Sequence, residues 1–276
     1  MTPSFYTQFC PLTSRPFLKK KIYEEIAPCD ALRPYVACFW SAERAGQDGA
    51  DGIVRVIPDA CVDIIIEINH SGQKISSRLC GLQDGPFIAG QRGRDEDVTQ
   101  FAVRFYFWAV HLFFRLDLDG LFNRMVDFEL IESGIGHKFQ ELFSMGTVAE
   151  RIAWMETYLL RKLDSTGYNP NLYNAIDCML KSRGSANVRD ICACSSVSQR
   201  QMERLFKQDI GISMKRMSSL VRYQNVWREV AAQERFAVQE AVYRYGYSDQ
   251  AHLLNEFKRF HGLWPDQARC AALRCV

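Results

Sequence analysis

The sequence has no apolar run approaching the roughly 18 residues that a membrane-spanning helix needs. Residues 1–21 also lack the apolar stretch of a secretory signal. These absences predict a soluble, cytoplasmic protein. With 47% hydrophobic and 24% charged residues the composition is that of a globular protein, which excludes a disordered chain, a collagen-like fibre and a coiled-coil rod.

Paired metal ligands are missing as well. None of the ten cysteines forms a Cys-x-x-Cys pair, and the five histidines form no His-x-His or His-Glu-x-x-His motif. We therefore expect no metal, no cofactor and no catalytic residues. Without an export signal, a disulfide framework is not expected either. Cys192 and Cys194 leave two interpretations open, a redox or metal sensor and a pair of small structural thiols, and the second is the simpler one.

Charge is distributed unevenly along the chain. Residues 1–165 carry 18 Lys and Arg against 22 Asp and Glu, whereas residues 166–276 carry 16 against 10, and 12 of those 16 are Arg. Arg suits bidentate contacts with phosphate and with guanine. Charge alone is explained as simply by a solvated basic surface, so a structural motif is needed before it indicates nucleic-acid binding.

The first half of the chain has the pattern of β structure. Short β-branched or aromatic segments at 53–57, 61–68, 74–80, 87–89 and 98–108 are separated by Pro and Gly, which predicts antiparallel strands in a barrel or sandwich. The pattern turns helical near residue 109, and Thr147 and Glu150 have capping-box spacing at the start of a helix over 147–163. We expect its apolar stripe to mediate any self-association, unless the stripe packs on its own barrel. The stripe consists of Val148, Ile152, Met155 and Leu159.

A polar, Gly-containing break at 165–168 separates this half from a helical second half. We place the domain boundary there, which gives an effector-binding or dimerisation domain over 1–165 and a DNA-binding domain over 166–276. N-cap residues and apolar periodicity predict helices from Pro170 towards Gly184 and over 188–194, 199–209, 213–232, 238–245 and 249–261.

Two segments of the second half repeat one arrangement: a short helix, a tight turn and a longer helix. The units span about 188–209 and 238–261, and their second helices end alike, in Leu-Phe-Lys at 205–207 and Glu-Phe-Lys at 256–258. This is the arrangement of a helix-turn-helix, whose second helix enters the major groove of DNA. The connecting helix, about 20 residues long, would span roughly 30 Å, close to the ~34 Å between successive major grooves.

The two second helices also resemble a known family. The runs that carry the resemblance are Ser198-Gln199-Arg200-Gln201-Met202-Glu203-Arg204-Leu205-Phe206-Lys207 with Gly211, and Gly246-Tyr247-Ser248-Asp249-Gln250-Ala251-His252-Leu253 with 257–262 and Pro265. Both are similar to the helix-turn-helix units of AraC/XylS-type transcription regulators, and the similarity extends over about 170–269. It implies sequence-specific DNA binding and control of transcription.

The resemblance also assigns roles to single residues. The family's base-facing positions fall on Arg200, Glu203 and Arg204 in the first unit, and on Gln250, Ala251 and Asn255 in the second. Arg suits guanine, Glu suits cytosine, and Gln and Asn suit adenine. An exposed helix face without a function is the alternative. The expected core consists of Met202, Leu205, Phe206, Trp227, Leu253, Phe257 and Phe260.

Four positions depart from the family's pattern. Ser196 stands where the first turn usually has Gly, Val242 replaces a smaller Ala, and Glu229 takes a usually apolar position on the connecting helix. Asn255 stands where many members carry a base-reading Arg. We therefore expect the second unit to discriminate between bases less than the first.

The N-terminal half is similar to a barrel-type sensor domain found in some of these regulators, through residues 32–40 and the run Ile57-Pro58-Asp59-Ala60-Cys61-Val62-Asp63-Ile64-Ile65. The similarity implies a small-molecule effector. Residues 104–108 depart from the Phe-Arg-Pro-Gly-like run of other members. Four side chains are candidates for lining an effector pocket, although packing or a salt bridge is the simpler role for each: Trp40, Arg55, Arg104 and Tyr106.

The sequence thus favours an α+β transcription regulator and not an enzyme, with an N-terminal antiparallel β barrel or sandwich-like domain with helices, followed by an all-α double helix-turn-helix domain. Its expected partners are double-stranded DNA, a small-molecule effector, RNA polymerase if it activates, and a second copy of the chain. Two alternatives stay open. One is a regulator that has lost DNA reading and acts through protein contacts. The other is a cupin-like barrel enzyme fused to a helical domain, although only His70 lies among the expected strands.

Overall fold

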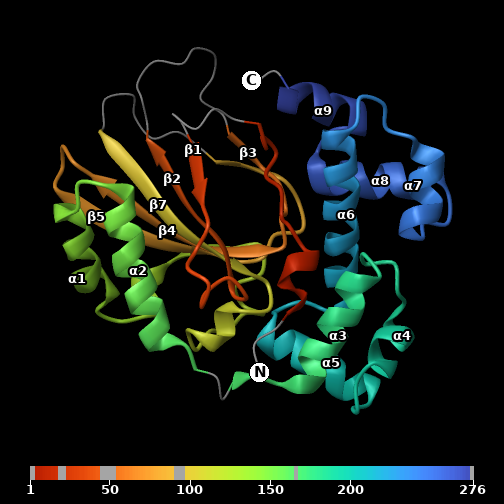
Figure 1. Ribbon diagram of the computed structural model, residues 1–276, viewed down its shortest axis with the longest axis horizontal. Helices are drawn as coiled ribbons and strands as arrows, with labels where there is room; N and C mark the ends of the chain where they lie inside the picture. The colour runs from red at the N-terminus through yellow and green to blue at the C-terminus, as the bar shows by residue number, and fades with distance from the viewer. Residues whose placement is uncertain (1–3, 18–22, 44–53, 90–96, 165–166, 274–276) are drawn as a thin grey trace.

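The computed structural model describes residues 4–17, 23–43, 54–89, 97–164 and 167–273. A β-rich N-terminal half lies beside a helical C-terminal half, and the long helix α6 (Met214–Ala232) faces the sheets (Figure 1). The α+β class is confirmed. The expected domain boundary falls on residues 165 and 166, which lie outside the described residues, and it stays a prediction. No helix in the described ranges is long and apolar enough to cross a membrane.

The described strands form two antiparallel sheets. The larger sheet has the order β1-β2-β7-β4-β5-β8, and the smaller pairs β3 with β6. Their bounds are β1 (Tyr23–Ile26), β2 (Val36–Glu43), β3 (Val54–Val56), β4 (Cys61–Asn69), β5 (Lys74–Cys80), β6 (Phe87–Ala89), β7 (Val98–Tyr106) and β8 (Met125–Asp127). The strands expected at 61–68, 74–80 and 87–89 are confirmed to within one residue. The strand expected over 98–108 ends at Tyr106, because the chain turns and the Ala109 amide donates to the Tyr106 carbonyl oxygen at 3.0 Å.

Two helices lie at the end of the larger sheet that is away from the helical half (Figure 1): α1 (Ile135–Phe139) and α2 (Val148–Lys162). The expected capping box starts α2, with the Glu150 amide donating to the Thr147 hydroxyl at 3.2 Å. Met155 and Leu159 are buried inside their own domain. Ile152 is partly buried against the same core, and the role of the stripe in self-association stays a prediction.

The helical half follows the expected order. Its helices are α3 (Pro170–Lys181), α4 (Val188–Ala193), α5 (Gln199–Asp209), α6, α7 (Val238–Tyr245), α8 (Gln250–His261) and α9 (Pro265–Leu273). Short 3₁₀ helices precede them in the chain: η1 (Phe5–Gln8), η2 (Val110–Leu112), η3 (Phe128–Leu130) and η4 (Gln140–Ser144). Helix α9, which the sequence pattern did not predict, begins with Pro265 at its first position, where the missing amide proton costs no intrahelical hydrogen bond.

The N-terminal segment 4–17 lies between the two halves (Figure 1). Phe5 contacts Trp108 of the β-rich half, with ring centroids 5.3 Å apart, and Tyr173 of α3, at 5.9 Å. The Tyr173 hydroxyl donates to the Trp108 carbonyl oxygen at 2.9 Å. Buried apolar side chains from both halves form a single cluster, so the two halves share a core instead of being joined by a linker alone.

Gly211 lies at a close contact between the backbones of the two halves. It follows α5 with φ +90°, a left-handed conformation that side chains other than glycine rarely adopt. A Cβ atom built there would lie 2.4 Å from the Leu118 carbonyl oxygen of the β-rich half. Backbone conformation and close approach therefore both require glycine.

We predict that Gly211→Ala lowers the free energy of unfolding of the full chain by about 1–3 kcal/mol, the usual cost of a strained backbone conformation. Gly146→Ala is the matched control, because a Cβ atom there meets nothing within 4 Å. Urea unfolding of both variants measures the difference. Equal stability of the two variants would show that the Leu118 contact does not constrain α5.

Candidate nucleic-acid interface

The first unit consists of α4, a turn and α5. Ser198 caps α5, since its hydroxyl accepts from the Gln201 amide at 3.3 Å while the Gln201 side chain accepts from the Ser198 amide at 2.9 Å. Met202 and Phe206 are fully buried beneath the helix. Gly184 lies at the end of α3 with φ +79°, and a Cβ atom there would be 2.3 Å from the Ser218 carbonyl oxygen. This close approach lets the end of α3 pack directly against α6.

The second unit consists of α7, a turn and α8. Gly246 ends α7 in the left-handed region with φ +67°, and Asp249 caps α8 by accepting from the His252 amide at 2.8 Å. Leu253, Phe257 and the rest of the expected core are buried in both units, except Leu205, which is only partly buried against the core.

A partly buried ion pair joins α8 to α6. The Arg222 guanidinium donates to both carboxylate oxygens of Glu256, at 2.9 Å each from Nη2. Tyr247 completes the site: its hydroxyl donates to Glu256 Oε1 at 2.8 Å, and its ring lies 4.1 Å from the guanidinium carbon. Such a bidentate pair fixes geometry as well as contributing energy.

Glu229 ties α7 to the same helix. Its carboxylate is buried and accepts from Arg244 at 2.7 Å and from the Tyr245 hydroxyl at 2.8 Å. A buried carboxylate needs such partners, because leaving it unpaired would cost several kcal/mol.

The side chains assigned to base reading are all exposed. On α5, Arg200 and Arg204 have no hydrogen bond or ion pair with any described residue, and Glu203 accepts from Gln199 at 2.9 Å. On α8, Gln250 donates to Gln239 of α7, and Ala251 and Asn255 lie on one exposed face. Residues three or four apart share a helix face, so each helix presents one compact set of side chains to solvent.

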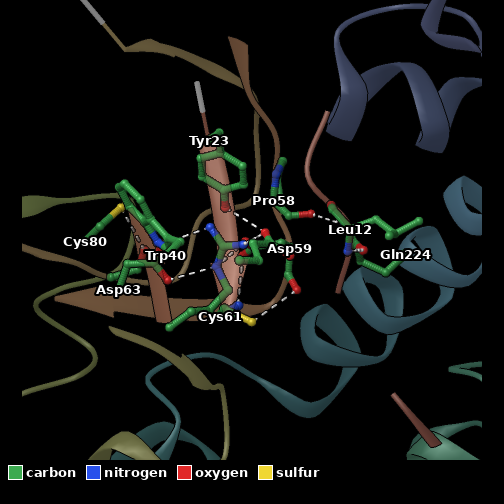
Figure 2. Close-up of polar contacts among 12 residues, drawn as sticks. Leu12, Tyr23, Trp40, Pro58, Asp59, Cys61, Asp63, Cys80 and Gln224 are labelled. Carbon is green, nitrogen blue, oxygen red and sulfur yellow. Dashed lines mark hydrogen bonds and ion pairs between the residues drawn. The ribbon is translucent and has the colours of Figure 1, made fainter. Parts of the chain in front are cut away.

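The helical half is held to the β-rich half through Gln224 of α6, which is fully buried. Its amide nitrogen donates to the Pro58 carbonyl oxygen at 2.7 Å, and its amide oxygen accepts from the Leu12 amide at 2.8 Å (Figure 2). One helical turn on, the Trp227 indole donates to the Thr13 carbonyl oxygen at 3.0 Å. Three segments of the chain therefore meet at one side chain.

Ion pairs join the halves at a second place. Lys207, near the end of α5, lies 3.1 Å from Asp119, and Arg216, in the first turn of α6, lies 3.4 Å from Asp84. Both acids belong to the β-rich half. The first recognition helix therefore shares a charged contact with the domain expected to bind the effector.

A buried charge cluster lies beside Pro58 in the β-rich half (Figure 2). Arg104 donates to both oxygens of Asp63 at 3.1 Å and to Glu25 at 3.1 Å, and it lies 3.3 Å from Asp59. Burial, and repulsion from Asp63, raise the pKa of Asp59, although Arg104 opposes the shift. Because Asp59 follows Pro58 directly, this cluster holds in place the loop whose Pro58 carbonyl oxygen accepts the hydrogen bond from Gln224.

The structure brings together two of the four candidate effector residues. Trp40 donates its indole proton to Asp63 at 3.0 Å, so it shares a partner with Arg104. Tyr106 stacks instead on Trp108, with ring centroids 4.4 Å apart. Arg55, on β3, lies against the end of α8, 2.5 Å from where a Cβ atom of Gly262 would be. The effector role of the four stays a prediction.

Within the described ranges no three His, Cys, Asp or Glu side chains are placed to hold a metal ion. A groove of about 580 Å³ lies between α3, α6 and α7, and one of about 540 Å³ lies between α5 and residues 111–116. Neither groove is lined by the four candidate effector residues.

Comparison with known families decides what the two units are. Residues 191–270 match a helix-turn-helix domain family, and residues 24–127 match a domain of unknown function, DUF6597. The C-terminal domain is an AraC-type helix-turn-helix domain. A domain of this type supports a DNA-binding transcription regulator.

Solved structures with a similar course of the chain are those of ToxT from Vibrio cholerae. The structure from strain O395 is 12% identical, covers 91% of this chain and 98% of ToxT, and has a TM-score of 0.40. A 1.65 Å structure in crystal form P21 is 10% identical, covers 84% and 98%, and has a TM-score of 0.42. ToxT with a bound unsaturated fatty acid, from strain SCE256, is 12% identical, covers 80% and 96%, and has a TM-score of 0.37. No curated protein matches the chain.

The departures of this AraC-type domain from its family have local explanations. Ser196 does not take a positive φ, and its amide donates to Asn171 at 3.0 Å, so the first turn needs no glycine here. Val242 is accommodated as a buried side chain under α7. Glu229 is the anchor for α7, as its two hydrogen bonds show.

Sequence reasoning missed the residues that hold the AraC-type domain together. Gln224 and Arg222 look like ordinary polar positions on a long helix, and His261 looks like a solvent-facing residue at a helix end. The partner of His261 lies 38 residues away in the chain, and one partner of Gln224 lies 212 residues away. Glu229 did give a signal, because an acid at a usually apolar helix position needs a buried partner.

His261 makes this domain sensitive to acid. Its ring is buried at the end of α8, hydrogen bonds to the Tyr223 hydroxyl at 3.0 Å and stacks on Phe257. Burial, with a smaller contribution from the charge of Arg55, lowers the pKa of His261 to about 3. The unfolded chain takes up this proton first as the pH falls below about 6.5, so the contribution to stability is full above that pH and is lost on acidification.

Between pH 7 and pH 5 the free energy of unfolding of the unsubstituted chain should fall, in part because of His261. We predict that this fall is about 2 kcal/mol smaller in His261→Gln, since pH 5 lies about 1.5 units below the pKa of histidine in the unfolded chain. Gln keeps a hydrogen-bonding group for Tyr223. Urea unfolding at both pH values measures the effect, and His252→Gln, at an exposed histidine, is the control. An unchanged pH dependence in His261→Gln would mean that the ring is charged in the folded protein.

Proposed function

We propose that the protein regulates transcription by placing α5 and α8 in two adjacent major grooves on one face of DNA. The observation that carries this proposal is that all six base-facing positions are exposed on helices supported by the same connecting helix. Arg222 and Tyr223 of α6 bind α8 directly, whereas α5 packs on α3, and α3 packs on α6. With 19 residues, α6 is about 28 Å long. That length is close to the ~34 Å repeat of the major groove.

The two helices would contribute unequally to this reading. In α5, Arg200 and Arg204 are charged, exposed and without a protein partner in the described ranges, so no existing ion pair has to break when they meet a guanine. In α8, Gln250 is already hydrogen bonded to Gln239, and Asn255 is short. We expect most of the base discrimination to come from α5.

Small-molecule control is a further part of the proposal. Residues 1–165 are proposed to bind an effector, and the contacts of Gln224, Lys207 and Arg216 offer three routes from that domain to the recognition helices. Among the candidate effector residues, Arg55 lies nearest to α8. Contact with RNA polymerase and pairing with a second copy remain predictions from the sequence.

We predict that Arg204→Ala weakens binding to the selected DNA site by about 1–3 kcal/mol while binding to random DNA changes little, because a bidentate contact with guanine is lost. The loss should be confined to one half of the site. Asn255→Ala should have a smaller effect in the other half. Binding to both DNAs, after selection of sites from genomic fragments, is measured at several salt concentrations.

Arg33→Ala is the matched control, because it also removes one exposed Arg but lies in the β-rich half, paired with Asp30 at 3.1 Å. If Arg204→Ala weakens both DNAs equally and lowers the salt dependence by about one unit, this Arg contacts the phosphate backbone instead. Failure of the intact protein to select any site would contradict the proposal itself.

A further inference from the structure

Two free thiols lie at the same backbone carbonyl group in the first helix-turn-helix unit. Cys178 lies on α3 and is half-buried, and Cys194 is the exposed residue that ends α4. Both thiols donate to the same acceptor, the Asp190 carbonyl oxygen, from Sγ atoms at 4.0 and 3.4 Å. Sharing this acceptor brings the two thiols close to each other.

The structure separates the two cysteines that the sequence places together. Cys194 shares the Asp190 carbonyl oxygen with Cys178 of α3, whereas burial and the charge of Glu203 on α5 raise the pKa of Cys192. Side chains two apart on a helix do not face each other. The natural partner of Cys194 is therefore Cys178.

The thiol pair lies at a sensitive place in the fold. Only the turn 195–197 separates Cys194 from Ser198, the N-cap of α5, and Arg200 follows two residues later. The same turn is held to α3 at a second point, where the Ser196 amide donates to Asn171 at 3.0 Å. A bond between Cys178 and Cys194 would enclose α4 and would fix the start of the turn that carries α5.

We propose that Cys178 and Cys194 form a reversible intramolecular disulfide under peroxide stress, making the first helix-turn-helix unit redox-sensitive. The inference rests on the position of the thiols and does not depend on how α5 contacts DNA.

The surroundings assign a role to each thiol. Burial raises the pKa of Cys178, and the proximity of Cys194 and the charges of Asp177 and Asp190 add to the shift. Cys178 therefore stays protonated, and the exposed Cys194 is the thiol that meets the oxidant. Lys181, paired with Asp177, is the cation that lies near both sulfurs.

The oxidation balances with hydrogen peroxide as the oxidant. The Cys194 thiolate attacks one peroxide oxygen, the O–O bond breaks, and a sulfenic acid and hydroxide form. Cys178 then attacks the sulfenic sulfur, the S–O bond breaks, and the proton of Cys178 leaves with that oxygen as water. Overall, two thiols and one peroxide give one disulfide and two waters, and a dithiol reductant reverses the step.

Bond formation should move and stiffen the unit. A disulfide holds its sulfurs about 2.05 Å apart, which is closer than two sulfur atoms can approach without a bond. Closing the bond therefore draws the end of α4 toward α3 and removes freedom from residues 188–198. The second unit contains no cysteine in α7 or α8 and is held by its own ion pair, so it should not respond.

The test treats the reduced full chain with a small excess of hydrogen peroxide and maps the products by mass spectrometry. Trypsin releases Cys178 in peptide 163–181 and Cys192 together with Cys194 in peptide 190–200. We expect these two peptides to be cross-linked within one chain and to separate after dithiothreitol. We also expect amide exchange in residues 188–198 to slow at least tenfold, with no change in α7 and α8.

Single variants identify the bonded sulfurs. The cross-link should survive in Cys192→Ser, the matched control, and should be absent from both Cys178→Ser and Cys194→Ser. Loss of the cross-link in Cys192→Ser, a bond between Cys192 and Cys194, a cross-link only between chains, or irreversible oxidation of Cys194 alone would each overturn the proposal. So would an exchange rate in 188–198 that oxidation leaves unchanged.

Discussion

The rest of the structure depends on one buried amide, that of Gln224 on the connecting helix. An amide without access to water costs about 1–3 kcal/mol when its hydrogen bonds are not made. Here Leu12 and Pro58 provide its hydrogen-bond partners, so the amide holds α6 in one position against the β-rich half. Since both helix-turn-helix units are attached to α6, the position of this helix also determines where they lie relative to the domain expected to sense an effector.

The two units are attached to α6 in different ways. The second is held by polar groups at three buried places, around Glu256, Glu229 and His261. The first is seated by the close backbone approach at Gly184, by apolar packing, and by the contact of Gly211 with Leu118. The helix with the charged reading residues thus contacts the other domain through Lys207 and the nearby Gly211, and the proposed disulfide would form in the same helix-turn-helix unit.

Local chemistry made much of this fold predictable. Capping residues such as Ser198 and Asp249, and the glycines after α7 and α8, act over a few residues, so the helix limits followed from the sequence to within about two residues. Strands β4, β5, β6 and β7 followed from alternation and turn residues, whereas β2 was not among the expected strands. Strands β1 and β8 did not, because short edge strands take their identity from the neighbours they pair with. The exposure of the base-facing positions was predictable from the family motif. The hydrogen bonds of Gln224 and the ion pairs of Arg104 were not, since their partners are distant in the chain.

The measurement that tests the central claim most directly is guanine methylation interference across a DNA site selected by the full chain. Two readers supported by one helix about 28 Å long should give two clusters of guanines whose methylation in the major groove interferes with binding, on one face of the duplex and centred about 10 base pairs apart. Methylation in the cluster read by α5 should interfere more strongly with binding than methylation in the cluster read by α8. A single cluster, or two clusters on opposite faces of the duplex, would contradict the account.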